Sequence, residues 1–558
     1  MTTDVRLADI ARRNRTGIEG FVTTTPHAAS AAQPLPADTD VVVIGAGHNG
    51  LVCACYLAKA GLRVSVVERA ALPGGMTTSG PFIPSAPGHT VNTCAVDLIA
   101  LLHSQIPREL ALREHGLKMV KPDPGYVSLH PDGESLALWR DPRRTAAEIE
   151  PHSRRDAAAF LDFMDLLDRV ITTALPIMGS DTARPSPRLI VHTAREAFKN
   201  RKRLSDIAAL LTGSAAMAVD ERFTHPLVRG ALVNLAGGAG PVDEPGSGLG
   251  FLLLALLSRA GVGRPIGGMQ TLTDALIRCL RAHGGALTTS APVAEILHAS
   301  GRVRGVELSD GRVVTARAVV SAADSWTTLR ELVDEDVVGP QLTARLDHSA
   351  ANRTGSGIFK IDMALSEQIH VISHKREDAV DLRRPTLLVA TEESVRESYA
   401  SAARGELPAD PALWLAAPSA EDPTQAPPGQ EVLYLYALSV PVAPAAGWEA
   451  VRHAAADAIL AKLGSYIQPL EQAEIGRLVE TPEDLAARLN VRNGCITHND
   501  MGLLNSGPLR PAVGLGLGKT PLEGLFLGGA GTHPGGGVSG LPGRTAAQRA
   551  ARHLKARR

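Results

Sequence analysis

Three closely spaced glycines follow a short apolar run near the start of the chain, in VVVIGAGHNGL at residues 41–51. The run predicts a buried strand, and the residues after the first glycines predict a helix over 48–60. At such a turn Gly45 permits the tight bend, Gly47 lets a pyrophosphate approach the backbone, and Gly50 lets the helix pack closely on the sheet. The free N–H groups and the positive dipole end of the helix would face the phosphates.

A second apolar segment over 62–68 ends in an acidic residue, Glu68. A carboxylate at this point can accept both hydroxyl hydrogens of a ribose, whereas it would repel a 2′-phosphate. The pattern therefore favours FAD or NAD over NADP. A tight turn in an ordinary α/β core is the alternative interpretation. Strand, helix, second strand and terminal acid all fall within about 30 residues, and this combination favours a dinucleotide site.

Glycines at two other places favour FAD. Gly74 and Gly75 could bring backbone against a second part of a long ligand. Near the C-terminus, GLFLGGAGTHPGGGVSGLPGR predicts a strand over 525–528 and a helix beginning near Val538. Two helix N-termini imply two charged places on one ligand. These would be the pyrophosphate and the N1/O2 edge of a flavin, which becomes anionic when reduced.

Size and charge restrict the class of protein. Because one core stops growing at roughly 250 to 300 residues, a chain of 558 residues predicts two intertwined domains. With 57 basic and 58 acidic side chains, the chain has no surplus of positive charge, which disfavours a nucleic-acid partner. Five cysteines without zinc-site spacing fit a reducing cytoplasm, and Cys53 and Cys55 are expected to pack in the core. The apolar run at 251–257 is too short to cross a bilayer.

The remaining segments predict further elements. Residues 1–39 are interpreted as a leader helix followed by an extended linker. Residues 151–262 are predicted to be helical, and 286–321 to form strands joined by hairpins. In the strand predicted over 431–440 both faces are apolar, so we expect it to be covered on both sides. Its two tyrosines are expected in the core, and contact with a substrate is the alternative.

The two glycine motifs together resemble one family. DVVVIGAGHNGL, VVER and PGG, with the C-terminal GLFLGGAGTHPGGGVSGLPGR, are similar to the carotenoid and retinoid oxidoreductases, which are phytoene desaturase-type flavoproteins. The resemblance is greatest to their branch called pyridine nucleotide-disulphide oxidoreductase domain-containing protein 2. It extends from about residue 38 to the end and includes GRPIGGMQTLTDAL, VVSAAD, PPGQEVLYLYAL, ETPEDLAARLNVRNGCITHND and GPLRP. The flavin domain is shared with amine oxidases.

Motifs and resemblance together predict an α/β fold in which a Rossmann-type FAD-binding domain, with a parallel sheet and an antiparallel flap, is interleaved with a mixed α+β substrate domain. The FAD-binding domain would comprise residues 40–120, 265–330 and 492–558. The substrate domain would comprise residues 121–264 and 331–491.

FAD is the expected cofactor, and no metal site is expected because the chain has no HExxH motif and no carboxylate cluster with metal spacing. In the resembling family the residue after a proline such as Pro292 offers its backbone to the adenine, which points to Val293; a plain buried strand residue is the alternative. The complete set of predicted cofactor-binding residues is Gly45, Ala46, Gly47, His48, Asn49, Gly50, Glu68, Arg69, Gly74, Gly75, Met76, Val293, Ala322, Gly529, Ala530, Gly531, Gly537, Val538 and Ser539.

Five polar residues are expected near the flavin: Thr532 and His533 in the C-terminal motif, and His498, Asp500 and Arg510, which coincide with recurrent family positions. The candidate catalytic residues are His498, Asp500, Arg510 and His533. A buried arginine could stabilise the reduced flavin or a substrate oxygen. The alternative is that Arg510 and Asp500 are structural partners at the domain seam. The two histidines are either acid–base groups or hydrogen-bonded neighbours of the site.

The resemblance implies an FAD-dependent oxidoreductase that desaturates, dehydrogenates or isomerises an apolar polyene or isoprenoid-like molecule by hydride transfer to flavin N5. Oxygen, a quinone or another carrier would reoxidise the flavin. A flavin amine oxidase is one alternative, disfavoured by only 19 aromatic residues (9 Phe, 6 Tyr and 4 Trp). An FAD-binding protein that mainly binds partners is another.

Localisation is predicted to be cytoplasmic. Residues 234–263 combine glycines with an apolar helix; they form either a core helix or the border of an entrance at a membrane surface. A peripheral membrane contact and a homo-oligomer both stay open.

Overall fold

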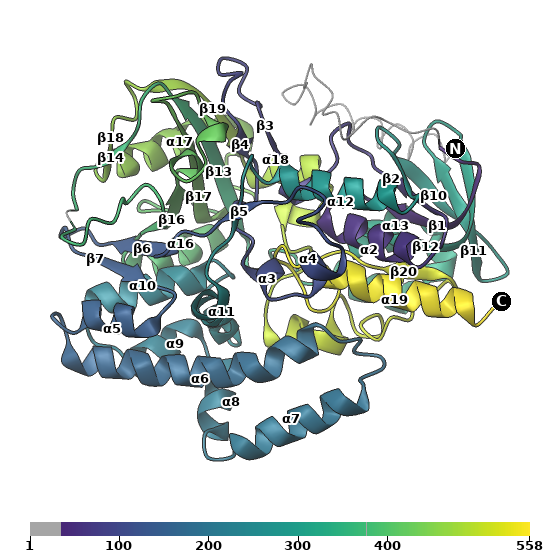
Figure 1. Ribbon diagram of the computed structural model, residues 1–558, viewed down its shortest axis with the longest axis horizontal. Coiled ribbons are helices and arrows are strands. Elements are labelled where there is room, and N and C mark those ends of the chain that lie inside the picture. Colours follow the sequence, from purple (N-terminus) through teal and green to yellow (C-terminus); the bar gives the residue numbers. More distant parts are fainter. Residues whose placement is uncertain (1–34, 375, 558) are drawn as a thin grey trace.

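The computed structural model describes residues 35–374 and 376–557 and contains two seven-stranded sheets (Figure 1). In the first sheet the order is β10-β11-β12-β1-β2-β9, with β20 also beside β12. Strands β9, β2, β1, β12 and β20 are parallel, and β10 and β11 form an antiparallel flap. The bounds are β1 (Asp38–Ile44), β2 (Val64–Val67), β9 (Ala286–Thr288), β10 (Val293–Ala299), β11 (Arg302–Leu308), β12 (Val313–Ser321) and β20 (Leu525–Leu527).

This first sheet confirms the predicted fold class, with small differences at element ends. Strand β1 begins at Asp38, two residues earlier than expected, and the predicted leader helix lies outside the described residues. Helix α2 (His48–Lys59) follows the glycine turn and packs against α12 (Gln270–Ala282) and α19 (Leu541–Lys555). Cys53 and Cys55 are fully buried in this layer, as expected.

The predicted start of the last helix is wrong by three residues, since α19 begins at Leu541 and not near Val538. Gly537 and Gly540 both have positive φ, +83° and +72°, so the backbone cannot yet be a right-handed helix there. Pro542 then occupies the first turn of α19, a position that needs no backbone N–H.

The second sheet has the order β19-β13-β17-β16-β15-β6-β7, and of its neighbouring pairs only β15 and β6 run parallel. Every residue of its strand β17 is buried, so the expectation that this strand is covered on both faces is confirmed. The bounds are β6 (Tyr126–Leu129), β7 (Ser135–Leu138), β13 (Ser356–Leu365), β15 (Thr386–Val389), β16 (Leu413–Ala416), β17 (Glu431–Pro441) and β19 (Glu474–Glu480).

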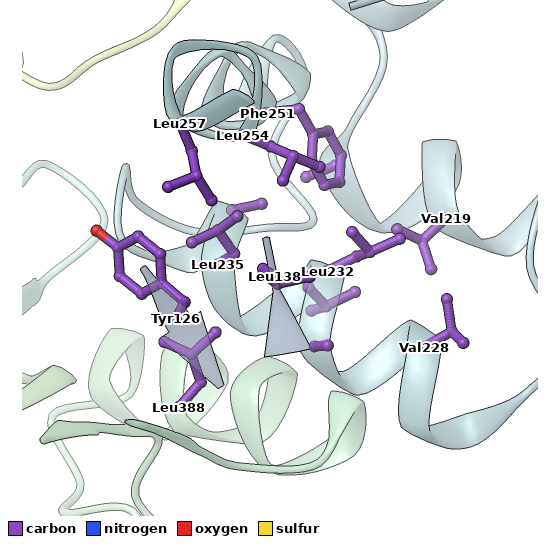
Figure 2. Packing of buried hydrophobic residues seen from close by; sticks show 14 of the residues in the cluster. Tyr126, Leu138, Val219, Val228, Leu232, Leu235, Phe251, Leu254, Leu257 and Leu388 are labelled. Atoms are coloured by element: carbon purple, nitrogen blue, oxygen red, sulfur yellow. The ribbon is translucent and has the colours of Figure 1, made fainter. Parts of the chain in front are cut away.

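Most of the helices between residues 142 and 260 form a large apolar cluster with one face of this second sheet, to which the helix 187–199 contributes no residue (Figure 2). Tyr126, Leu138 and Leu388 of the sheet belong to this cluster together with Leu232 and Leu254 of the helices. The helices are α5 (Pro142–Ile149), α6 (Arg154–Met178), α7 (Pro187–Lys199), α8 (Leu204–Thr212), α9 (Ala215–Asp220), α10 (Pro226–Gly237) and α11 (Leu252–Ala260), with η3 (Ser247–Phe251) before α11.

The other described elements are α3 (Ile99–Leu102), α4 (Ile106–Glu109), α13 (Ser325–Glu331), α14 (Glu335–Val338), α15 (Pro340–Asp347), α16 (Glu392–Ala403), α17 (Trp448–Gly464) and α18 (Pro482–Leu489), with β3 (Ser79–Gly80), β4 (Val91–Asn92), β5 (Met119–Val120), β8 (Arg264–Pro265), β14 (His370–Val371) and β18 (Ile467–Gln468). Over the described ranges, no helix is both long and apolar enough to span a membrane. Each sheet draws its strands from distant parts of the sequence, and the exact domain boundaries stay a prediction.

Replacing Leu232 by alanine should open a cavity in the cluster of Figure 2, because this side chain is fully buried. We expect the free energy of unfolding to fall by about 2 to 5 kcal/mol, measured by urea denaturation. Leu161→Ala on α6 is the matched control; its side chain is 41% exposed, and its effect should stay below about 0.5 kcal/mol. Equal effects for the two variants would show that the cluster is not close-packed.

Candidate functional site

The glycine turn between β1 and α2 has the tight geometry that its sequence predicts. Gly45 has a φ of +94°, a conformation that favours glycine. A Cβ on Gly50 would lie 2.0 Å from the carbonyl oxygen of Gly45, so only glycine fits there. Gly47 instead forms a bridge with Gly74, and a Cβ on it would approach nothing closer than that residue's oxygen, 4.0 Å away. The space beside Gly47 is therefore open.

Glu68 is held at the end of β2, directly beside the turn. Its carboxylate accepts the N–H of Ala46 at 2.7 Å and that of Ala70 at 2.8 Å. Its backbone carbonyl accepts the N–H of Ala291 at 2.8 Å, which brings Val293 at the start of β10 close to the same edge. The predicted ribose and adenine positions thus lie next to each other.

Arg69 points away from this edge. Its guanidinium donates to the carbonyl oxygens of Ala487 and Arg488, at 3.0 and 2.8 Å, and so caps the end of α18. The side chain connects the segment after β2 to α18, and its cofactor contact stays a prediction.

The C-terminal motif meets the first turn through backbone contacts. A Cβ on Gly543 in α19 would lie 1.9 Å from the carbonyl oxygen of Asn49 in α2. One on Gly529 would lie 2.7 Å from the carbonyl oxygen of Ala322. The ring of His48 is hydrogen-bonded to the backbone of Gly537. Opposite ends of the chain therefore converge on one place, where α2 and α19 begin.

The other predicted cofactor residues surround this place. The carbonyl of Met76, in η2 (Gly75–Thr77), accepts the N–H of Ala95 at 3.1 Å. A Cβ on Gly531 would lie 2.9 Å from Ser325 Oγ. Val538 is half-buried against the core, and Ser539 Oγ accepts the N–H of Leu541 at 3.3 Å, at the first residue of α19. These residues lie in the same glycine-rich segments.

Arg510 is fully buried, and its hydrogen bonds go to main-chain carbonyl oxygens. Such a set of contacts matches the structural alternative, in which this cation organises the loops around the C-terminal motif. Burial lowers the pKa of its guanidinium to about 10, so it is still charged at neutral pH. The acceptors are the carbonyls of Thr497, Asn499, Asp500, Asn505 and Ala530.

Asp500 and His533 also have structural contacts. The carboxylate of Asp500 accepts the N–H groups of Asn352 and Arg353, at 2.6 and 3.1 Å. One ring nitrogen of His533, Nε2, is 3.0 Å from the carbonyl oxygen of Ile177 at the end of α6. Thr532 Oγ1 closes a turn by donating to the carbonyl of Gly529 at 2.9 Å.

Two buried histidines, His48 and His498, lie near each other beside the first turn. Burial lowers the pKa of His498 to about 4, and the nearby charge of Arg510 contributes. Burial also lowers the pKa of His48 to about 4, and the neighbouring His498 adds to the shift. His48 Nε2 and His498 Nδ1 have no hydrogen-bond partner in the described protein, and neither does Asn49 Oδ1. Both rings are neutral at pH 7.

A buried charged cluster escaped the sequence analysis. Lys360 and Asp362 lie two residues apart on β13 and form an ion pair with almost no exposure, while Arg488 pairs with Glu480 beside them. Burial lowers the pKa of Lys360 and raises that of Asp362 to about 6. The Lys360 ammonium lies 3.8 Å from the ring centre of Tyr434. The only sequence signal was two charges at alternate positions of the apolar strand GIFKIDMAL.

This cluster adjoins the first domain through the segment before α3. Tyr434 Oη donates to the carbonyl of Cys94 at 2.6 Å, and Arg488 donates to that of Thr93 at 3.4 Å. The same segment reaches back to the Gly74 turn, since Ala95 contacts Met76. Lys360 and Asp362 thus lie where the second sheet meets the glycine-rich segments.

These features define a Rossmann-type dinucleotide-binding protein whose ligand site is completed by its last helix. The family described as flavin containing amine oxidoreductase matches residues 50–554. The chain is 30% identical to mouse (Mus musculus) pyridine nucleotide-disulfide oxidoreductase domain-containing protein 2, covering 93% of this chain and 94% of that protein. It is 27% identical to a lycopene-forming phytoene desaturase of Paracoccus sp., covering 91% and 96%.

Among solved structures, a putrescine oxidase triple mutant superposes with a TM-score of 0.60 at 17% identity, covering 93% of this chain and 99% of that chain. At this identity the likeness supports the fold. The chain belongs to the flavin containing amine oxidoreductase family and is an FAD-dependent oxidoreductase. The resemblance to phytoene desaturase-type flavoproteins is confirmed.

FAD fits the residues that meet at this place. Helix α2 has Gly47 as its N-cap residue and no side-chain cap, so its first main-chain N–H groups can receive an anionic pyrophosphate. The open space beside Gly47 lets a ligand approach the main chain. Within the described ranges, no group of three or more His, Cys, Asp or Glu side chains could hold a metal ion.

Alanine at Gly47 and at Gly50 should have different consequences. Gly47→Ala meets no atom of the protein within contact distance and has an ordinary φ of −67°, so the fold should survive while FAD affinity falls at least about tenfold. Gly50→Ala clashes with the Gly45 carbonyl and should lower thermal stability even without FAD. Flavin titration and thermal unfolding measure the two effects. Unchanged FAD affinity in Gly47→Ala would contradict the assignment of this turn.

Acid should destabilise the FAD-free protein through His498. Its folded pKa of about 4 lies below the ordinary value of 6.5, so the unfolded state binds more protons and stability is lost as pH falls from 6.5 toward 4. The loss from this residue is about 2 kcal/mol between pH 7 and pH 5. His498→Asn, which tolerates the positive φ of this position, should flatten the dependence in urea denaturation; the exposed His453→Asn should not.

Proposed function

We propose that this oxidoreductase dehydrogenates or isomerises an apolar polyene or isoprenoid-like molecule. The observation that carries the proposal is the pairing of charges beside the glycine-rich segments: Asp362 is paired with Lys360, and Glu480 with Arg488. A cationic amine would find these carboxylates already neutralised and the face of Tyr434 already occupied by an ammonium group. The similarity to a lycopene-forming phytoene desaturase along nearly the whole chain supports an uncharged substrate.

The proposed roles of the site residues follow from their positions. The turn from Gly45 to Gly50 would receive the pyrophosphate, Glu68 the ribose hydroxyls, and the backbone of Val293 the adenine. The segments around Ala322 and Gly529 to Ser539 would hold the flavin end. When bound, FAD supplies the hydride-accepting group of a dehydrogenation.

The protein must orient the substrate and handle the proton that leaves with the hydride. Asp362 Oδ2 is buried and has no hydrogen-bond partner in the described part of the chain. We propose that this oxygen takes up the proton, since burial brings the pKa of the carboxyl to about 6. Lys360, bound to the other oxygen, fixes its orientation.

A second candidate, amine oxidation, is kept because the family description and the putrescine oxidase fold both point to it. The second sheet also gathers aromatic rings: Tyr434 and Tyr436 are nearly parallel, with centres 6.4 Å apart. The two rings stand side by side on one strand, at alternate positions of β17. Amine oxidases often hold the amine between aromatic faces.

Anaerobic reduction tests both candidates in one measurement. We expect the visible absorption of the oxidised flavin to bleach with isoprenoid polyenes and to stay unchanged with a panel of amines. Asp362→Asn should slow the bleaching at least about tenfold while the flavin content is retained. Bleaching by amines with peroxide release in air, and none by polyenes, would overturn the proposal in favour of amine oxidation. A flavin that no compound reduces would favour a partner-binding role.

A further inference from the structure

Helix α7 turns its apolar side away from the protein. Towards α6, Asn200 at its C-terminal end accepts a hydrogen bond from Arg169 at 3.1 Å, and His192 Nε2 lies 3.2 Å from the carbonyl oxygen of Thr172. The opposite side exposes Ile190, Val191 and Phe198, which are 57%, 67% and 69% exposed. A surface helix of a globular protein ordinarily buries its apolar side, so this reversed orientation calls for a partner.

We call Ile190, Val191 and Phe198 the α7 apolar face. Figure 1 shows α7 at the lower edge of the molecule, on the side of α6 away from both sheets. A second exposed apolar segment, residues 501–517, lies near the residues that precede α7, because Thr182 Oγ1 donates to the carbonyl of Gly516 at 2.9 Å. That segment exposes Met501, Leu503, Leu509, Val513 and Leu517.

The surroundings of the α7 apolar face carry more basic than acidic side chains, although Lys199 pairs with Glu196 and Arg203 pairs with Asp162 and Asp206. Residues 184–203 contain seven Lys or Arg and one Glu, in a chain whose net charge is −1. Arg184, Arg188 and Arg195 are exposed. A cleft of about 460 Å³ beside the start of α7 is lined by Arg184, Arg188, His192 and Arg552, together with Asp181, which pairs with Arg552. The guanidinium of Arg201 lies 4.6 Å from the ring centre of Phe198.

We propose that α7 docks on the surface of an anionic lipid bilayer. Its apolar face would enter the boundary between headgroups and acyl chains, and the flanking cations would bind lipid phosphates, as in basic amphipathic helices that lie in a membrane interface. The charge also decides against a second copy of the chain as the occupant. Two copies meeting through α7 would place like charges opposite each other.

The position of α7 relates this docking to the redox site. Helix α6 ends at Met178, shortly before α7, and the carbonyl of Ile177 contacts His533 of the C-terminal motif. The exposed segment 501–517 contains Arg510, which binds the carbonyl of Ala530. A bilayer under α7 would therefore lie next to the C-terminal motif and could supply an apolar substrate. This supply rests on the proposed function, whereas the docking does not.

Vesicle flotation of the FAD-loaded protein tests the docking without any substrate. We expect the protein to float with vesicles of phosphatidylcholine containing roughly one third phosphatidylglycerol, and at least about tenfold less with phosphatidylcholine alone. The triple variant Ile190→Ser, Val191→Ser, Phe198→Ser should lose binding to a similar extent. The double variant Val313→Ser, Ile372→Ser removes apolar residues of 43% and 46% exposure elsewhere and should float like the wild type.

Flavin content and thermal unfolding would verify that the serine variants are folded. The proposal is overturned if the wild type stays unbound with anionic vesicles at low salt, or if the triple variant floats equally well. A lipid-free wild-type dimer that the triple variant dissociates, seen by light scattering, would instead identify a second copy as the partner. Because these readouts need no turnover, they are independent of the flavin reduction experiment.

Discussion

The dinucleotide site depends on backbone packing against backbone at places where no side chain fits. Gly50 lies against the carbonyl of Gly45, Gly543 against that of Asn49, and Gly529 against that of Ala322. Each contact fixes the distance between two segments: β1 and α2, α2 and α19, and the ends of β12 and β20. The N–H groups and the positive dipole end of a helix N-terminus can bind a phosphate only when the phosphate reaches the main chain closely.

The second constraint is electrostatic, at the junction of the two sheets. Lys360, Asp362, Glu480 and Arg488 are removed from water as two ion pairs, and a buried pair is costly unless each charge has its partner. The buried charge of Arg510 is stabilised by hydrogen bonds to main-chain carbonyl oxygens and not by an ion pair. The two ion pairs together carry no net charge, and they lie near the glycine turn between β1 and α2, where a negative charge is favoured.

Sequence reasoning located the first sheet and the dinucleotide turn because their signals are local: a glycine at a positive φ, an apolar strand and a terminal acid such as Glu68. It misplaced the start of α19, where two successive positive-φ glycines delay the helix. It could not find Lys360 and Asp362, whose meaning depends on pairing with β19 and on the distant Arg488. It named Asp500 and Arg510 through resemblance, either as chemical groups or as structural partners, and their hydrogen bonds in the structure go mainly to the backbone. The segment 234–263 proved mainly buried, as its core-helix alternative states, and the exposed apolar side chains lie on α7 instead.

The meeting of α2 with α19 has a consequence for biosynthesis. The polypeptide emerges from the ribosome with β1 and α2 first, and nearly 500 residues separate α2 from its partner helix. The packing of α2 against α19 therefore forms only after α19 has been synthesised. A product cut short before Leu541 lacks the helix that packs against α2 beside the glycine turn.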